Sequence, residues 1–158
     1  MKISVLIPVY NFDVKGLVSK LKTQCEKALE LEDYELLLID DASDNKYSNS
    51  KLSSEKVSYT ELNENIGRSK IRNLLAEKAR FEVLLFLDCD SDIQKEDFIK
   101  AYIQHYQDNS IVYGGRTYQD NAPDDPSLYL RWKYGVEREI VLANVRIQKP
   151  YSSFMTNN

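Results

Sequence analysis

The segment Ile3-Ser4-Val5-Leu6-Ile7-Pro8-Val9 opens the chain with an almost continuous run of apolar residues. A short run of this kind is typical of a β-strand that is covered on both faces. Pro8 has no backbone N–H to donate to a neighbouring strand, so we expect the strand to end there. Because strands buried on both faces occur mainly in parallel sheets, this segment predicts an α/β protein.

Two similar apolar runs follow, at Tyr34–Ile39 and at Phe81–Leu87. Between the first two runs, apolar residues recur at helical spacing from Val14 to Leu29, and Asp13 is placed to be the N-cap of that helix. A strand, a helix and a second strand in so short a segment form a βαβ unit. The expected fold is therefore α/β, with a mostly parallel, Rossmann-like open sheet flanked by helices.

Further elements have weaker signals. We expect a loop or short irregular helix at Asn45–Glu55 and an edge strand at Lys56–Leu62. A helix should begin at Gly67, and another should span Lys95–Gln107. Ile111–Tyr113 is predicted to form a short strand, and residues 128–144 are mostly compatible with helix.

The composition is that of a globular domain, because 42% of the 158 residues are hydrophobic and 29% are charged. The formal net charge of −4 gives no overall attraction to nucleic acid, so we expect no nucleic-acid partner. Cys25 and Cys89 lie far apart without metal-ligand spacing, which favours a reduced, cytoplasmic protein. No signal peptide or membrane-spanning run is apparent, although peripheral contact with a membrane is compatible with the sequence.

Polar clusters follow three of the predicted parallel strands: one after Val9, one at Asp40-Asp41 and one at Asp88-Cys89-Asp90. The carboxyl ends of parallel strands meet at one edge of an open sheet, where helix N-termini and loop amides converge. The sequence therefore predicts a ligand site at this edge.

The Asp88-Cys89-Asp90 cluster suits a divalent cation. If the segment is extended, alternation directs the Asp88 and Asp90 side chains the same way, and carboxylate oxygens suit Mg²⁺ or Mn²⁺. The alternative is an acidic loop or a helix N-cap without a metal.

Asp40-Asp41 and Ser43 form a second candidate, since a carboxylate at a strand end can accept an N–H of a nucleobase. The alternative is a turn held by its own side chains, without a ligand.

The third candidate is the basic start of the helix after Gly67, where Arg68 and Arg72 share one face and could meet an anion. There the alternative is a solvated basic surface.

Taken in order, Ser4–Asn11, Ile39–Ser43, Asn65–Ala76 and Leu87–Asp90 resemble the motifs of the nucleotide-binding half of family 2 glycosyltransferases. That family has the GT-A fold and uses nucleotide-sugar donors. The resemblance implies that residues 1–158 form a single GT-A nucleotide-sugar-binding domain.

The resemblance assigns roles to residues at the sheet edge. Pro8 and Tyr10 would line the nucleotide pocket, Asp41 would bind the base, and Arg72 would lie against the base. Gly114-Gly115 matches a strand that passes beneath the donor sugar in such enzymes.

It also implies a metal site. Asp90 would be the principal ligand of Mn²⁺ or Mg²⁺, and Asp88 would reach the ribose or the metal. The acidic general base of the family has no counterpart here, although Ser152–Asn158 resembles the strand that precedes it. We therefore expect a truncated catalytic domain that lacks the C-terminal acceptor and catalytic-base part.

The implied function is inverting transfer of a sugar, from a UDP-sugar, to a glycan or glycolipid acceptor in surface polysaccharide synthesis, at the cytoplasmic face of the membrane. One alternative is a non-catalytic nucleotide-binding fragment. Another is a phospho-receiver signalling domain, but its acid pair should follow the first strand rather than the second. Residues 129–134 mix aromatic and basic side chains that could stack on an acceptor sugar, rest on a membrane or pack as a helix.

Overall fold

The computed structural model describes residues 1–44 and 47–148 of the chain. They divide into two compact units, with the boundary between His105 and Tyr106. The first unit contains a sheet with its helices, and the described part of the second unit contains helices joined by extended segments.

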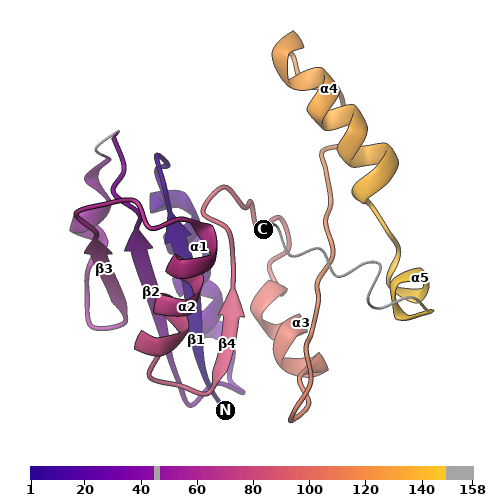
Figure 1. The fold of residues 1–158 in the computed structure, drawn as a ribbon. Coiled ribbons are helices and arrows are strands. Elements are labelled where there is room, and N and C mark those ends of the chain that lie inside the picture. Colours follow the sequence, from indigo (N-terminus) through magenta and orange to yellow (C-terminus); the bar gives the residue numbers. More distant parts are fainter. Residues whose placement is uncertain (45–46, 149–158) are drawn as a thin grey trace. The chain divides into compact units, whose positions relative to one another are not determined.

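The first unit is built on a four-stranded sheet with the order β3-β2-β1-β4. All the paired strands are parallel, and their arrows point the same way in Figure 1. The strands are β1 (Lys2–Val9), β2 (Asp33–Asp40), β3 (Val57–Glu61) and β4 (Val83–Phe86). Parallel pairing brings the carboxyl ends of the strands to one edge.

Helices cover both faces of this sheet (Figure 1). They are α1 (Lys15–Lys27), the 3₁₀ helix η1 (Ser48–Leu52), α2 (Arg68–Lys78) and α3 (Phe98–His105). Val5 and Ile7 of β1 belong to the core formed with α1 and α3, whereas Leu6 belongs to the core formed with α2. This alternation explains the continuous apolar run of β1, since both of its faces are buried. The predicted fold class, a parallel α/β sheet flanked by helices, is confirmed.

The strand β1 does not end at Pro8 but continues to Val9, which corrects the expected boundary. Leu6 accepts the N–H of Leu87, so residues 6 and 8 of β1 direct their backbone polar groups toward the β4 side. The pairing of β1 with β4 stops at Leu6. Pro8 therefore lies where no backbone N–H is needed to bond a neighbouring strand.

The first helix begins and ends slightly inside its predicted limits. Val14 is the N-cap residue rather than Asp13, whose Oδ1 instead accepts the N–H of Lys15 at 3.0 Å. The helix ends at Lys27, so Leu29 lies beyond it and is exposed rather than on the buried face.

The predicted strand Phe81–Leu87 is shorter and less covered than its sequence indicates. β4 spans Val83–Phe86, and within it only Leu85 is buried. β4 is an edge strand of the described sheet. Leu84 and Phe86 are therefore partly exposed, although the apolar run predicts a strand buried on both faces.

The described part of the second unit is helical where the sequence favours helix. It contains α4 (Pro126–Tyr134), the π-helical turn η2 (Gly135–Glu139) and α5 (Ala143–Gln148). No strand forms at Ile111–Tyr113, which corrects that prediction, and Gly114-Gly115 is likewise not in a strand. The expectation for Ser152–Asn158 lies outside the described residues. No helix in the described ranges combines the length and apolar character needed to cross a membrane.

A partly buried carboxylate organises the second unit. Glu139, whose side chain is 9% exposed, accepts hydrogen bonds from the Tyr118 hydroxyl and from the guanidinium groups of Arg116 and Arg131. Burial alone would raise the pKa of Glu139, but these donors outweigh it and lower the pKa to about 2.

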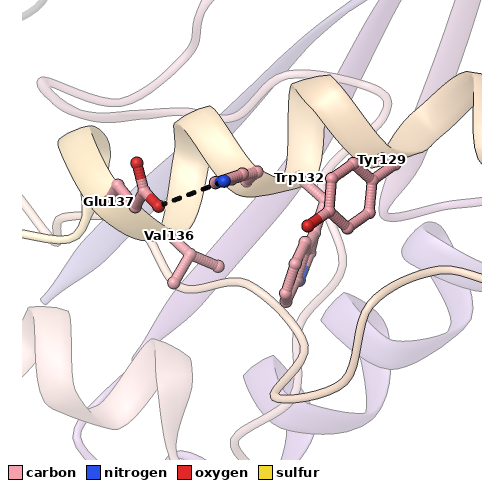
Figure 2. Close-up of a pocket in the computed structure, with 5 residues that line it drawn as sticks. Tyr129, Trp132, Val136 and Glu137 are labelled. Atoms are coloured by element: carbon pink, nitrogen blue, oxygen red, sulfur yellow. Dashed lines mark ion pairs between the residues drawn. The ribbon is translucent and has the colours of Figure 1, made fainter.

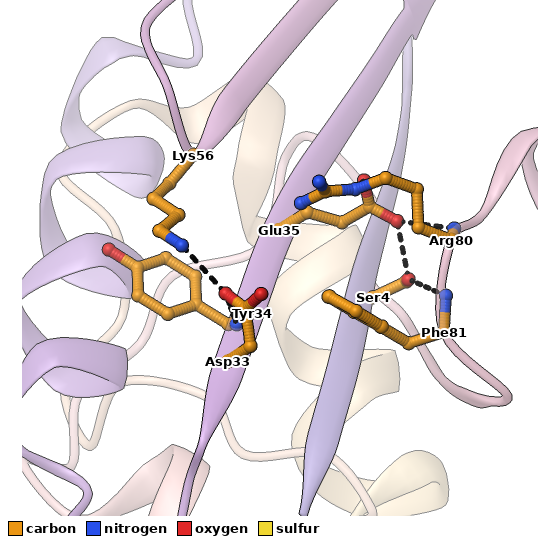
Figure 3. A network of polar contacts seen from close by, with 7 residues as sticks. All are labelled: Ser4, Asp33, Tyr34, Glu35, Lys56, Arg80 and Phe81. Atoms are coloured by element: carbon orange, nitrogen blue, oxygen red, sulfur yellow. Dashed lines mark hydrogen bonds and ion pairs between the residues drawn. The ribbon is translucent and has the colours of Figure 1, made fainter.

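A buried carboxylate ties the amino-terminal ends of the strands of the sheet together (Figure 3). Glu35 of β2 accepts the Ser4 hydroxyl at 2.6 Å, the Arg80 backbone N–H at 2.6 Å and Arg80 Nε at 2.8 Å. Ser4 Oγ in turn accepts the N–H of Phe81 at 3.2 Å. The network fixes the connection between α2 and β4 onto β1 and β2, and it lies away from the carboxyl edge.

Replacing Glu35 with alanine should lower the free energy of unfolding by about 2–4 kcal/mol, because three donors lose a buried acceptor. Urea denaturation of the chain measures the change. Glu77→Ala, on the exposed surface of α2, is the matched control and should change stability by less than about 0.5 kcal/mol. Equal effects of the two substitutions would contradict the structural role of Glu35.

The stabilising effect of Glu139 should depend on pH. Because folding lowers the pKa of Glu139 from 4.5 to about 2, its contribution is complete above the ordinary pKa and is lost as the pH falls toward 2. The difference in unfolding free energy between wild type and Glu139→Gln should therefore shrink over that range. The fluorescence of Trp132, the single tryptophan, reports on this unit. The exposed Glu137→Gln is the control, and a difference that stays constant with pH would refute the assignment.

Candidate functional site

The strand order places a topological switch point beside β1. The chain proceeds from β1 outward to β2 and β3, and then returns to β4 on the opposite side of β1. In open parallel sheets, ligands bind in the crevice at the carboxyl ends of the strands that flank such a point. Tyr10, Asp41 and Asp88, which come just after β1, β2 and β4, lie at this edge, as the sequence predicts.

Asp40 serves the architecture of the edge. Asp40 is only 3% exposed. Both of its carboxylate oxygens accept hydrogen bonds from other residues of the protein. Oδ1 accepts the Ser43 N–H at 2.7 Å and Oδ2 accepts the Tyr59 hydroxyl at 2.6 Å. Burial and the neighbouring Asp40 carboxylate raise the pKa of Tyr59, so the phenol stays protonated as a donor. Nothing in the sequence singles out Tyr59, because the pattern of an edge strand does not show which residue a tyrosine hydroxyl will bond.

Asp41 holds the segment that leads into α2. It is 5% exposed, and its Oδ1 and Oδ2 accept the backbone N–H groups of Ile66 at 2.7 Å and Gly67 at 2.9 Å. Asn65 donates its side-chain amide to the Asp41 carbonyl at 3.1 Å. Gly67 has a φ of 84°, a conformation that favours glycine. The start of α2 is thus fixed by Asp41, and the predicted contact with a base remains a prediction.

The turns after β1 and β2 are tied to each other. Ser43 Oγ accepts the Asn11 N–H at 2.7 Å. Asn11 and Ala42 both have left-handed backbone conformations, with φ of 50° and 58°. This conformation is common for Asn but costs about 1 kcal/mol or more for Ala. The hydrogen bonds of Asp40, Asp41 and Ser43 hold Ala42 in place.

The residues expected to line a nucleotide pocket reach the surface of this edge. The ring of Tyr10 is about half exposed, and its hydroxyl donates to Asp44 Oδ2 at 3.3 Å. Pro8, at the same end of β1, is partly buried. An exposed aromatic ring beside a switch point offers a flat apolar surface on which a ring of a ligand can stack.

Arg72 and Asp88, both predicted site residues, are brought together. Arg72 Nη2 lies 2.6 Å from Asp88 Oδ1, and the two side chains are 27% and 43% exposed. Arg72 Nη1 also donates to the carbonyl of Arg68 at 3.4 Å. A cation and an anion of the candidate site therefore neutralise each other at the carboxyl end of β4.

The segment that contains Asp88 and Asp90 is not extended. The Ser91 N–H donates to the Asp88 carbonyl at 3.1 Å, which closes a turn, and Asp90 is exposed within it. The alternation along a strand that was expected to align the two carboxylates therefore does not apply. Burial raises the pKa of the intervening Cys89, so without a metal its thiol stays protonated at neutral pH.

The donor set is compatible with a divalent cation that a bound diphosphate completes. Within the described residues, no group of three or more His, Cys, Asp or Glu side chains forms a ready-made metal site. Mg²⁺, however, is commonly held by one or two carboxylates together with phosphate oxygens of a substrate. The partly exposed Asp88 and the exposed Asp90 fit that arrangement.

The second unit has its own aromatic hollow, drawn in Figure 2. It is lined by Tyr129, Trp132, Lys133, Val136 and Glu137. The rings of Tyr129 and Trp132 have centroids 5.8 Å apart, and Lys133 pairs with Glu137 at 4.0 Å. Trp132 Nε1 donates to the Gln119 carbonyl at 2.8 Å, so this ring also holds the preceding loop. The interpretations of the aromatic stretch as an acceptor or membrane contact stay predictions.

The parallel sheet and its switch point define an open-sheet α/β protein with polar side chains gathered at the carboxyl edge. The model of the family described as "Glycosyl transferase family 2" matches residues 4–155, and the chain belongs to that family. The resemblance found in the sequence is thereby confirmed, and it favours a GT-A glycosyltransferase over a phospho-receiver domain.

Similar proteins include the poly(ribitol-phosphate) β-N-acetylglucosaminyltransferase TarS of Staphylococcus aureus, in strains Mu50 and MW2. Each is 34% identical over 122 residues, which is 71% of this chain. The chain spans 21% of the length of these relatives. A crystal structure of S. aureus TarS 1-349 in complex with UDP is 27% identical, with a TM-score of 0.48 over 65% of this chain and 31% of that one. A crystal structure of S. aureus TarS is also 27% identical, with a TM-score of 0.47 over 65% of this chain and 19% of that one.

Replacing Asp41 with asparagine should lower the free energy of unfolding by about 1–3 kcal/mol, because an amide can accept only one of the two backbone N–H bonds. Thermal or urea unfolding measures the loss. Asp44→Asn, the same change at an exposed position of the same turn, is the control and should cost less than about 0.5 kcal/mol. If Asp41→Asn is as stable as the control, Asp41 does not hold the start of α2.

Proposed function

We propose that this chain contributes the donor-binding part of an inverting glycosyltransferase that uses a UDP-sugar. The observation that carries the proposal is the switch-point edge of a family 2 chain. Its polar residues follow the strands or lie in the second turn of α2: Tyr10, Asp41, Asp88 and Asp90 follow strands, and Arg72 is in the helix. The sequence similarity to TarS favours N-acetylglucosamine as the sugar and a cell-surface polymer as the acceptor. The acceptor class is a glycan, a glycolipid or a phosphate-linked polyol polymer.

The nucleoside would lie at the carboxyl ends of β1 and β2. The half-exposed ring of Tyr10 and the partly buried Pro8 would provide an apolar surface for it. Asp41 would accept a hydrogen bond from the base with a lone pair that its two backbone hydrogen bonds leave available. It would also fix the segment before α2, next to the base. Arg72 would place a positive charge beside the bound nucleotide.

Asp88 and Asp90 would hold a divalent cation, Mn²⁺ or Mg²⁺, together with the diphosphate of the donor. When bound, such an ion supplies positive charge that offsets the negative charge developing on the departing nucleoside diphosphate. This chain would contribute two acidic side chains that follow β4, one of them paired with Arg72.

Inversion requires a single displacement in which a carboxylate removes the proton of the acceptor hydroxyl. Among the described residues, the carboxylates of Asp40, Asp41 and Glu139 are occupied by hydrogen bonds within the protein, so none of the three suits this role. We therefore assign donor binding to this chain and leave the general base unassigned. A location at the inner face of the membrane would suit an enzyme that uses a UDP-sugar donor.

A thermal-shift panel of UDP-, GDP- and dTDP-sugars, with and without Mn²⁺, tests the proposal. UDP-N-acetylglucosamine with Mn²⁺ should give the largest rise in melting temperature, since a ligand at 100 times its Kd stabilises by about 2.7 kcal/mol. If no nucleotide sugar raises the melting temperature, donor binding by this chain is refuted.

Asp90→Ala should remove the dependence of UDP binding on Mn²⁺ in isothermal titration. Asp92→Ala is the matched control, because Asp92 is an exposed acid two residues further on that pairs with Lys20 at 2.5 Å. Binding of UDP without any sugar transfer by the complete protein would favour the non-catalytic nucleotide-binding alternative. Identical titrations for both variants would refute Asp90 as a metal ligand.

A further inference from the structure

The ion pair between Arg72 and Asp88 has a consequence for the order in which ligands bind. Asp88 is a candidate metal ligand, yet one of its oxygens already lies 2.6 Å from a guanidinium nitrogen. Arg72 reaches it from the second turn of α2 and is also bonded to the Arg68 carbonyl, so the guanidinium is held at two points. The guanidinium therefore lies beside Asp88 in the folded chain, with 27% of its side chain exposed.

A divalent cation that approaches Asp88 therefore meets a positive charge already in place. The guanidinium neutralises the carboxylate that would attract the ion and repels the ion directly. The remaining predicted ligand, Asp90, is exposed, so water weakens its attraction for the ion. On these grounds, the free protein should bind Mn²⁺ or Mg²⁺ weakly.

A nucleoside diphosphate changes this balance because it brings negative charge to the same edge. Its phosphate oxygens can accept hydrogen bonds from Arg72 and can also complete the coordination of the metal. Arg72 then has a second anionic partner, and the Asp88 carboxylate becomes available to the ion. Both charges of the ion pair gain new partners only when nucleotide and metal are present together.

We propose that Arg72 is a positioning residue, an internal counterion of Asp88 that makes binding of the metal depend on binding of the nucleotide. The inference rests on the proposed function for the location of the donor and deepens it by assigning a coupling role. In thermodynamic terms, Mn²⁺ and UDP bind with positive coupling, and each raises the affinity of the chain for the other by the same factor.

The test measures binding of Mn²⁺ without nucleotide, by isothermal titration or by electron paramagnetic resonance of free Mn²⁺, and binding of UDP with and without Mn²⁺. In the wild type, Mn²⁺ should raise the affinity for UDP by roughly tenfold or more. In Arg72→Gln, the affinity for Mn²⁺ alone should rise by roughly fivefold, the affinity for UDP should fall, and the coupling factor should fall by roughly fivefold or more, with direct coordination of the metal by phosphate accounting for the coupling that is left.

Two further variants test whether the effect depends on the positive charge at position 72 and whether it is specific to that position. Arg72→Lys keeps the positive charge and should retain weak binding of Mn²⁺ alone. Lys78→Gln removes one positive charge from the last turn of the same helix and should leave every affinity unchanged. Melting curves of all three variants establish that each is folded.

The outcomes distinguish this inference from the proposed function. Failure of the wild type to bind UDP would overturn the proposed function, and the coupling role with it. Binding of UDP by the wild type, with the same Mn²⁺ affinity and the same coupling factor in folded Arg72→Gln, would overturn the coupling role alone. A fall in affinity for Mn²⁺ alone in Arg72→Gln would also overturn it, because it would make Arg72 a support for the metal rather than its competitor.

Discussion

The burial of two adjacent carboxylates at the end of β2 is the constraint on which the polar edge of the first unit depends. A carboxylate removed from water must find hydrogen-bond donors or it destabilises the fold. Asp40 finds them in Ser43 and Tyr59, and Asp41 finds them in the backbone of Ile66 and Gly67. The donors come from separate segments, so satisfying these two charges brings the loop after β2, the edge strand β3 and the start of α2 to fixed positions.

The acidic residues of this edge consequently divide into two groups. Asp40 and Asp41 are buried and engaged with the protein itself, whereas Asp88 and Asp90 stand at the end of β4 with part of their surface in water. The first group holds the loops of this edge in place through its hydrogen bonds, and the second group has exposed surface that a ligand can contact.

Each unit also has a carboxylate with a structural role of its own. Glu35 joins the α2–β4 connection to the sheet, and Glu139 gathers Tyr118 and two arginines within the second unit. In both cases, hydrogen bonds to the ionised form outweigh burial and lower the pKa of the acid. Acidic residues thus contribute to the stability of this chain as well as to its proposed chemistry.

The sequence by itself determined the parallel α/β fold, the family and the edge at which polar residues gather. It could do so because Ile3–Val9 and Tyr34–Ile39 carry a pattern that is local in the chain, and because the order of motifs is visible in one dimension. The partners of those residues were decided by the tertiary structure alone. That Asp41 binds backbone amides beyond β3, that Tyr59 donates to Asp40, and that Arg72 meets Asp88 depend on contacts between residues far apart in the chain. The strand predicted at Ile111–Tyr113 failed for the same reason, since a strand exists only where another strand is present to pair with it.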